Sequence, residues 1–261
     1  MDTLTRPDGT LVYEVAGVGP PLLLVTSLGG SRHYWASVRD RLTPHFTVVT
    51  HDHMGTGDTV SRRSHHTVEA LAADVVALMD HLAIPKAHLV GHSTGAAVGQ
   101  ILGAEAPERL DGLVLYAGWA GPDPYFDQCF KVRKELLLGA GASAYHRATP
   151  LFLYPPDWLA ADAARLEALV GGMIASSPPS ETMAGRVDML LNFDRRAWLP
   201  QVRARTLVLC ASDDTLTPPH LSREMAQAIP GAELALVPWG GHALSQTAPD
   251  VFLSHVMAAL T

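Results

Sequence analysis

A serine between two glycines, at the end of an apolar run, is the first candidate for chemistry in this chain. The segment from Leu89 to Gly95 (LVGHSTG) passes from an apolar strand pattern directly into a helical pattern of small residues. This order predicts a sharp turn that presents the hydroxyl of Ser93, and the flanking glycines leave room for a base beside it. A hydroxyl is a weak nucleophile until a base takes its proton. The same five-residue pattern also occurs in glycine-rich loops, so its meaning depends on the rest of the chain.

An acid and a base that could serve Ser93 stand later in the chain, each after a strand pattern. Asp213 and Asp214 follow the apolar run Thr206–Ala211, and His242 follows a Gly-Gly turn. Parallel strands bring their carboxyl ends to one edge of a sheet, where ligands bind in open α/β folds. We therefore expect His242 to act as the base for Ser93, with an aspartate that orients its ring.

His92 adjoins the serine and is the other candidate base. Side chains of adjacent residues diverge at a sharp turn, so the ring of His92 is predicted to project away from the Ser93 hydroxyl. We expect His92 to line the pocket or to have a structural role, and not to take the proton of the nucleophile.

Two backbone N–H groups are candidates for stabilising the negative charge that develops on an attacked carbonyl oxygen. Thr94 directly follows the nucleophile and supplies the first. The second is expected from Leu28, in the turn after the apolar run Leu22–Thr26. Ser27 in the same turn could bond a substrate or be structural. Trp119, close to the end of another strand pattern, is the aromatic residue expected to contact the substrate.

The elements that must position these residues form an alternating pattern of strands and helices. Six short apolar runs predict a mostly parallel sheet, and several are apolar on both faces, as expected of strands covered by helices on each side. Helical spacing predicts helices over Thr67–Leu82 and Ser93–Ala106. Thr10–Ala16 alternates like an antiparallel edge strand. The six strand runs are Leu22–Thr26, Thr47–Asp52, Ala87–His92, Leu110–Ala117, Thr206–Ala211 and Glu233–Pro238.

The regular alternation stops at Trp119 and resumes after Trp198. The residues between them are rich in aromatics, prolines and glycines, with short helical patterns. This interruption falls where the parallel strands point their carboxyl ends, so the sequence predicts a helical lid over the site. The expected organisation is a core domain of residues 1–118 and 199–261 with a lid (cap) insertion of residues 119–198.

Composition and charge narrow the class of partner. The chain has 261 residues and a formal net charge of −7, without a Lys/Arg cluster, which disfavours binding to nucleic acid or anionic membranes. No apolar stretch is long enough to span a membrane, and the first residues lack a signal-peptide pattern, so a cytoplasmic location is expected. Cys129 and Cys210 are expected to be free thiols. The expected partner is a small-molecule substrate, and a homodimer is left open.

Four histidines, His51, His53, His65 and His66, invite a metal-site interpretation, because closely spaced pairs can ligate zinc. No cysteine or grouped carboxylate completes a ligand shell, and a serine-based site needs no metal ion. We therefore expect neither a metal ion nor a cofactor.

These motifs resemble those of the α/β-hydrolase superfamily over nearly the whole chain. The segments that carry the resemblance are Gly91–Gly95, Asp214–Pro218 and Gly240–His242. The resemblance implies an α/β-hydrolase fold, with a mostly parallel central sheet, helices on both faces and an inserted helical lid. It also implies a triad of Ser93, His242 and Asp214. In this family the acid precedes a Thr-Pro pair by this spacing, which selects Asp214 and leaves Asp213 as a turn residue.

Two segments depart from the usual pattern of this superfamily. Relatives often have His-Gly before the oxyanion donor, where this chain has Thr26 and Ser27. Only the backbone N–H of Leu28 is required there, so this departure is compatible with the expected role. Met54 stands where an arginine is common, which affects local packing and not the triad.

A second resemblance is carried mainly by segments of the predicted lid. The chain is similar there to the aminoacrylate/carbamate hydrolases of the Rut pyrimidine-degradation pathway, while Ser27–Gly29 is similar to the segment in 3-oxoadipate enol-lactonases. This resemblance implies a serine hydrolase that cleaves a small carbamate, amide, ester or lactone through an acyl-enzyme. The matching segments are Cys129–Arg133, Pro150–Pro155, Asp157–Trp158 and Cys210–Asp214.

Alternative functions stay open at this point. They are a carboxylesterase or enol-lactonase of aromatic catabolism, a non-hydrolytic oxygenase or perhydrolase, and a ligand-binding pseudoenzyme; the complete triad argues against the last. An anionic substrate would need a cation in the pocket. The candidates, each more often a solvated surface residue, are Arg32, Arg133, Arg186 and Arg196.

Overall fold

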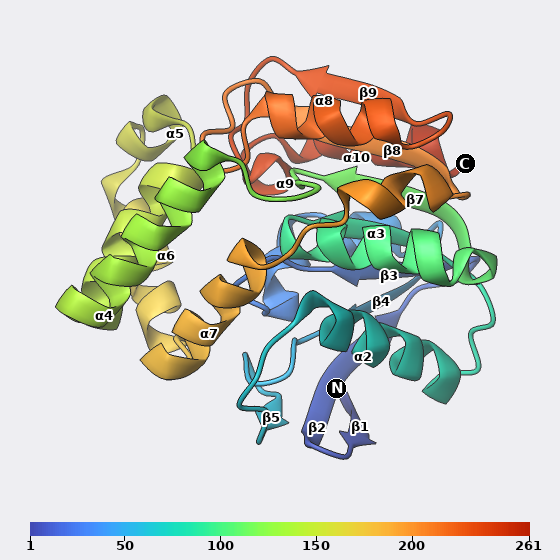
Figure 1. The fold of residues 1–261 in the computed structure, drawn as a ribbon, viewed down its shortest axis with the longest axis horizontal. Coiled ribbons are helices and arrows are strands. Elements are labelled where there is room, and N and C mark those ends of the chain that lie inside the picture. The colour runs from blue at the N-terminus through green and yellow to red at the C-terminus, as the bar shows by residue number, and fades with distance from the viewer.

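A nine-stranded sheet runs through the molecule, with helices on both of its faces (Figure 1). The computed structural model describes residues 1–261. The strands are β1 (Asp2–Arg6), β2 (Gly9–Ala16), β3 (Pro21–Val25), β4 (Thr47–His51), β5 (Val60–Ser61), β6 (Ala87–His92), β7 (Leu110–Tyr116), β8 (Arg205–Ala211) and β9 (Glu233–Val237). They follow the order β1-β2-β4-β3-β6-β7-β8-β9, and β5 pairs with β2. β2 is antiparallel to β1, β4 and β5, whereas the pairings along β4-β3-β6-β7-β8-β9 are all parallel.

The helices alternate with the strands along the chain, as the sequence predicts. They are α1 (Arg39–Leu42), α2 (Val68–His81), α3 (Thr94–Glu105), α4 (Pro124–Leu153), α5 (Pro156–Ala160), α6 (Ala163–Ala175), α7 (Ser180–Leu191), α8 (Pro219–Ala228), α9 (Leu244–Thr247) and α10 (Pro249–Leu260). Short 3₁₀ helices cover Arg32–Ser37, Pro107–Arg109 and Arg196–Gln201. None of the helices is both long and apolar enough to cross a membrane.

The parallel strands are apolar on both faces because each face has its own core. In β3, Leu23 and Val25 belong to the larger core cluster, together with residues of α2, α3 and α8. Leu22 and Leu24 point the other way, into a second cluster with residues of α1 and α10. Successive side chains of a strand alternate between faces, so a strand buried on both sides must be apolar throughout. The predicted doubly covered, mostly parallel sheet is confirmed.

The predicted edge strand Thr10–Ala16 is wrong in its place in the sheet. It forms β2, which pairs with β1 on one side and with β4 and β5 on the other. The edge is β1, whose residues are mostly exposed or half-buried. Leu4 is the only apolar side chain of β1, so the segment lacks the hydrophobic pattern of a strand.

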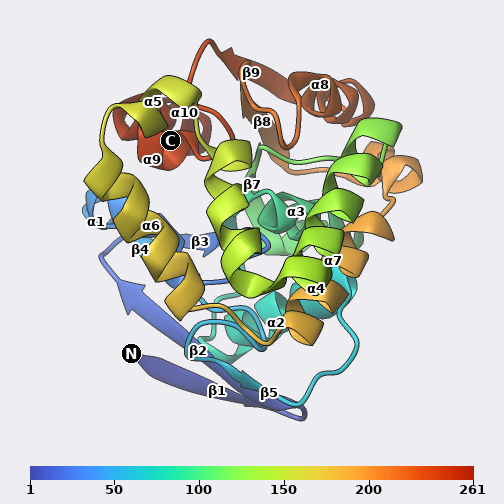
Figure 2. The same ribbon diagram turned by 90° about the vertical axis from the view of Figure 1, so that its left-hand side faces the viewer.

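Four helices, α4 to α7, form an insertion between β7 and β8 that projects beyond one end of the sheet (Figure 1). We call residues 124–191 the helical insertion. Its first helix, α4, consists of two arms separated by a kink at Gly141, where φ is +85°. Figure 2 shows the two arms as a bent pair beside α6 and α7. The helical insertion therefore lies where the sequence predicts a lid.

Candidate active site

Ser93 lies at a strained turn between a central strand and a buried helix. β6 ends at His92 and α3 begins at Thr94, so Ser93 alone makes the turn, with φ 54° and ψ −110°. Non-glycine residues rarely adopt a positive φ, and such strain clusters at functional sites. The backbone here therefore has the geometry that the Gly-x-Ser-x-Gly pattern predicts.

Both glycines of this pattern are required by close backbone contacts. A Cβ atom on Gly91 would lie 2.1 Å from the carbonyl oxygen of Gly95. A Cβ atom on Gly95 would lie 2.1 Å from the carbonyl oxygen of Val25, at the end of β3. The small residues thus bring the amino-terminal end of α3 against the turn that follows β3. This contact places the turn that contains Leu28 beside the one that contains Ser93.

Replacing Gly95 with alanine is expected to lower the free energy of unfolding by about 3 kcal/mol or more, because the new methyl group meets backbone that no rotamer change can move. The matched control is Gly139→Ala in α4, where an added Cβ atom meets nothing within 4 Å. That variant should be neutral or more stable by up to ~1 kcal/mol, since alanine favours a helix. Urea denaturation of both variants checks this, and equal stability would contradict the packing argument.

Asp214 and His242 form a buried pair after β8 and β9. Oδ2 of Asp214 lies 2.9 Å from Nδ1 of His242, and both side chains are almost fully buried. Oδ1 of Asp214 accepts hydrogen bonds from the backbone N–H groups of Leu216 at 2.8 Å and Thr217 at 2.9 Å. The hydroxyl of Thr217 lies 2.9 Å from Oδ2 of Asp214 and 3.1 Å from Nδ1 of His242. These contacts fix the carboxylate, which in turn fixes the imidazole.

The neighbouring Asp213 has a different place in the structure. Its carboxylate accepts hydrogen bonds from the backbone N–H groups of Gly240 at 3.2 Å and Gly241 at 2.9 Å. Those glycines form the turn just before His242, and both have positive φ angles of 144° and 63°. Asp213 thus holds the turn that carries the histidine, in agreement with its predicted role as a turn residue.

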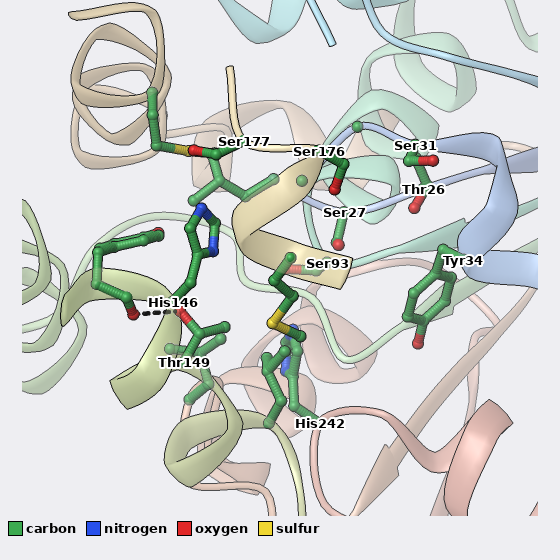
Figure 3. A pocket seen from close by; sticks show the side chains of 18 of the residues that line it. Thr26, Ser27, Ser31, Tyr34, Ser93, His146, Thr149, Ser176, Ser177 and His242 are labelled. Carbon is green, nitrogen blue, oxygen red and sulfur yellow. Dashed lines mark hydrogen bonds between the residues drawn. The ribbon is translucent and has the colours of Figure 1, made fainter. Parts of the chain in front are cut away.

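Ser93 and His242 line one cavity of about 220 Å³ (Figure 3). Ser27 and Leu28 line the same cavity. Neither Oγ of Ser93 nor Nε2 of His242 has a hydrogen-bond partner, and neither atom is fully enclosed by the protein. Both reactive atoms are therefore available to a ligand in the cavity.

Leu28 and Thr94 are the two residues whose backbone N–H groups are expected to face a developing oxyanion. No carbonyl group accepts a hydrogen bond from the N–H of Leu28. Thr94 is the first residue of α3, where a backbone N–H has no partner within the helix. The helix dipole also favours negative charge at this end of α3.

Arg186 reaches the Leu28 turn from the helical insertion. Its guanidinium is fully buried and donates to the carbonyl oxygen of Leu28 through Nε at 3.0 Å and Nη2 at 2.7 Å. Nη2 also lies 2.9 Å from Nδ1 of His53, and no carboxylate pairs with this cation. Burial lowers the pKa of Arg186 to about 10, so the side chain is charged at neutral pH.

The prediction that the four candidate arginines are surface residues is wrong for three of them. Arg32, Arg133 and Arg186 are buried, and only Arg196 is substantially exposed. Arg32 pairs with Asp52, so it serves the core and not the cavity. Composition alone assigns arginine to the surface. The contacts that hold Arg32 and Arg186 inside come from other segments of the chain, and those of Arg133 come from both arms of α4.

His92 holds the backbone of His242, a contact that the sequence did not predict although it predicted a lining or structural role. Its ring stacks between Tyr34 and Tyr116, with ring centroids 4.4 and 4.5 Å apart. Burial and the nearby His242 drive the pKa of His92 well below its usual range, so the ring is neutral. Nε2 of His92 lies 2.9 Å from the carbonyl oxygen of His242, which also accepts from the hydroxyl of Tyr116 at 2.8 Å. His92 thus lines the cavity and positions His242, in agreement with the lining or structural role expected of it.

The predicted contact between Trp119 and a substrate is wrong. Trp119 is fully buried, stacks on Phe126 with centroids 4.8 Å apart, and does not line the cavity. Its side chain belongs to the larger core cluster, where it also contacts Phe193. The aromatic rings that do line the cavity are Tyr34, Phe130, Tyr145 and Tyr154.

Three of the four histidines considered as zinc ligands are buried, and His65 is exposed. His51 lies in β4, where burial lowers its pKa to about 4. His53 meets Arg186 as described above, and His66 is buried, with its pKa lowered to about 4, chiefly by burial. No group of three or more histidine, cysteine, aspartate or glutamate side chains is arranged to hold a metal ion.

Comparison with known proteins identifies the family to which the chain is similar. The family model described as alpha/beta hydrolase fold matches residues 20–151. A protein of Caulobacter sp. (strain K31) named "Putative carbamate hydrolase RutD" is 42% identical over 257 residues, which cover 96% of each chain. The protein of the same name from Azorhizobium caulinodans is 40% identical over 94% of this chain and 92% of its own length.

Two solved structures resemble the whole chain. A hydrolase from Pseudomonas aeruginosa PA01 superposes with a TM-score of 0.89 at 29% identity, covering 99% of this chain and 97% of its own. The enol-lactonase from Burkholderia xenovorans LB400 has a TM-score of 0.90 at 25% identity and covers 99% of both chains. The chain therefore belongs to the α/β-hydrolase family and is a hydrolase.

Proposed function

We propose that the protein hydrolyses a small carbonyl substrate through Ser93, His242 and Asp214, with an acyl-enzyme intermediate. The observation that carries this proposal is the 2.9 Å contact between Asp214 and His242 beside a strained Ser93 in the same cavity. A serine, a histidine and an aspartate in this arrangement are the groups that acyl transfer requires.

In the proposed reaction, Nε2 of His242 takes the proton of Ser93 as Oγ attacks the carbonyl carbon. The N–H groups of Leu28 and Thr94 stabilise the oxyanion. The tetrahedral intermediate collapses when His242 gives its proton to the leaving group. A water molecule, deprotonated by the same histidine, then attacks the acyl-enzyme and releases the acid and the free Ser93 hydroxyl.

The substrate is expected to be small. The cavity of about 220 Å³ is below the ~300–1,000 Å³ typical of pockets for drug-sized ligands. Residues of α4, α6 and α7 line it, among them Phe130, Leu169 and Met183, which supports the proposal that residues 119–198 act as a lid. Relatives named carbamate hydrolases favour a carbamate or related amide, and the enol-lactonase structure makes a lactone or ester the alternative.

A panel of small carbamates, amides, esters and lactones tests the proposed function, with wild-type protein compared with Ser93→Ala. Turnover of at least one class, abolished in the variant, is the expected result. A panel member that wild type and Ser93→Ala convert at the same rate would contradict the proposed mechanism. Formation of an oxygenated product that depends on dissolved oxygen would favour the non-hydrolytic alternative.

Replacing Arg186 with methionine is expected to lower kcat by about 10- to 100-fold with a smaller change in KM, because the charge and two hydrogen bonds to the Leu28 carbonyl are lost. Arg186→Lys keeps the charge and one donor, so it should recover part of kcat. Steady-state kinetics of both variants, with unfolding curves recorded in parallel, check this. If the two variants lose stability equally and show equal kcat, Arg186 is structural only.

A further inference from the structure

The cavity carries a positive charge that the protein does not neutralise. Arg133, from the first arm of α4, lines the cavity, and an arginine side chain stays charged in proteins. No aspartate or glutamate lines the same cavity. Arg133 is only 4% exposed, and its contacts within the protein are hydroxyl groups and aromatic rings. A buried cation without a counterion is unfavourable, so a negatively charged ligand in this cavity would remove part of that cost.

Hydrogen-bond donors around Arg133 also lack acceptors. Nη2 of Arg133 donates to the hydroxyl of Tyr145 at 2.9 Å and to Thr149 at 3.4 Å, but Nε and Nη1 have no partner. The hydroxyl proton of Tyr145 has no acceptor in the protein. Nε2 of His146 is enclosed and has no partner either, so it is an unused donor when it carries the ring proton. The wall of the cavity around Arg133 therefore holds more unused donors than acceptors.

Three aromatic rings hold the guanidinium in place. Cζ of Arg133 lies 5.6 Å from the ring centroid of Phe130, 5.1 Å from that of Tyr145 and 5.0 Å from that of Phe152. These contacts compensate part of the desolvation of the cation and restrict its movement. Nε and Nη1 lack acceptors and are enclosed by the protein in this structure, so a ligand oxygen would meet them once the guanidinium turns toward the cavity that Arg133 lines.

Thr149, which contacts Arg133, and its neighbour His146 lie to one side of Ser93 in the cavity. Figure 3 shows His146 and Thr149, from α4, on one side of the cavity, and Ser27 and Tyr34 on the other, with Ser93 between the two sides. A ligand that fills the cavity would reach both Ser93 and the α4 side. Its anionic group would then be separate from the carbonyl group near Ser93.

We propose that Arg133, Tyr145 and His146 form an anion subsite that binds a carboxylate of the substrate, separate from the carbonyl that Ser93 attacks. The preferred substrates are thus small acyl compounds that carry one further carboxylate. This inference rests on the proposed function, because it specifies which substrates the same site accepts. It also explains how a protein of net charge −7 can bind an anion, since the local field of a buried arginine exceeds that of distant, solvated charges.

Two esters of the same size test the subsite. Monomethyl succinate carries a carboxylate, and methyl succinamate carries a neutral amide in its place. Wild-type protein is expected to show a kcat/KM for monomethyl succinate at least about 10-fold higher, because a hydrogen bond to a charged group is stronger than one to an amide. Arg133→Met should bring the two values within about threefold, and Arg133→Lys should retain part of the preference.

Lys131→Met is the matched control. Lys131 also lies on α4, but it is more than half exposed and pairs with Asp127 on the outside. This variant removes one positive charge from the same helix without touching the cavity, so it should keep the wild-type preference. A loss of preference as large as that of Arg133→Met would show that overall charge, and not the subsite, selects the ester.

Binding to Ser93→Ala, measured by calorimetry, separates this inference from the proposed function. Tighter binding of monomethyl succinate than of methyl succinamate supports the subsite, even if wild-type protein hydrolyses neither ester. The absence of hydrolysis would count against the proposed reaction and not against the subsite. Equal or weaker binding of the anion overturns the subsite while leaving hydrolysis intact. These comparisons do not require an Arg133 variant, so they decide the matter even if Arg133→Met fails to fold.

Discussion

Replacing Ser93 with alanine is expected to lower kcat by about 10³- to 10⁶-fold, because no other hydroxyl in the cavity lies at the strained turn beside His242. The free energy of unfolding should change by less than about 1 kcal/mol, since Oγ of Ser93 makes no hydrogen bond in the protein. Steady-state kinetics on a substrate found in the panel, together with urea denaturation, measure both quantities.

The control for this variant is Ser254→Ala, on the exposed side of α10, where the hydroxyl bonds only the carbonyl oxygen of Val251. It should retain wild-type kcat. A Ser93→Ala protein with nearly unchanged turnover would remove this serine from the mechanism, whatever the geometry of its turn.

Replacing Asp214 with asparagine is expected to lower kcat by about 10⁴-fold. Oδ1 of Asp214 accepts from two backbone N–H groups, so the amide oxygen of the asparagine will take that position and its NH₂ group will face Nδ1 of His242. Nδ1 must then accept a hydrogen bond, which moves the ring proton to Nε2. In that tautomer His242 cannot take the proton of Ser93.

Asp213→Asn is the matched control for Asp214→Asn. Its carboxylate supports the turn before His242 through two backbone N–H groups, and an asparagine oxygen can still accept from them. We expect a loss of less than about tenfold in kcat. If Asp213→Asn were the more damaging of the two, the assignment of the acid to Asp214 would be wrong.

Local sequence patterns predicted the parts of the fold that depend on local chemistry. The parallel strands are apolar throughout because helices cover both faces of the sheet, so each strand can be recognised from its own run of apolar residues. The glycines around Ser93 were informative for a similar reason, since a turn this tight excludes a side chain at Gly91 and Gly95. The fold class and the resemblance to α/β-hydrolases are confirmed.

The predictions that failed depend on contacts between distant residues. Trp119 lies close to a strand end, yet its ring packs in the core against Phe126 and against Phe193, 74 residues later. Arg186 is buried because it bonds a carbonyl oxygen 158 residues earlier, at Leu28. Nothing within a few residues of either position carries that information. The partner of His92, the carbonyl group of His242, is likewise 150 residues away, so the sequence predicted a lining or structural role without the contact that gives it.

The helical insertion contributes to both ends of the proposed site. Arg186, on α7, bonds the turn expected to hold the oxyanion, and Arg133, on α4, lies in the cavity wall. Neither cation has a carboxylate partner in the protein. We infer that sequence changes in residues 124–191 alter turnover and substrate choice together, because the same helices supply both contacts.

Labelling with a fluorophosphonate, followed by intact-mass measurement, tests the central claim most directly, since this reagent reacts with a serine only when a base activates it. Wild-type protein should gain the mass of one label per chain, and Ser93→Ala and His242→Ala should gain none. Labelling of wild type that persists in Ser93→Ala, or well-folded wild type that takes up no label, would contradict the claim that His242 activates Ser93.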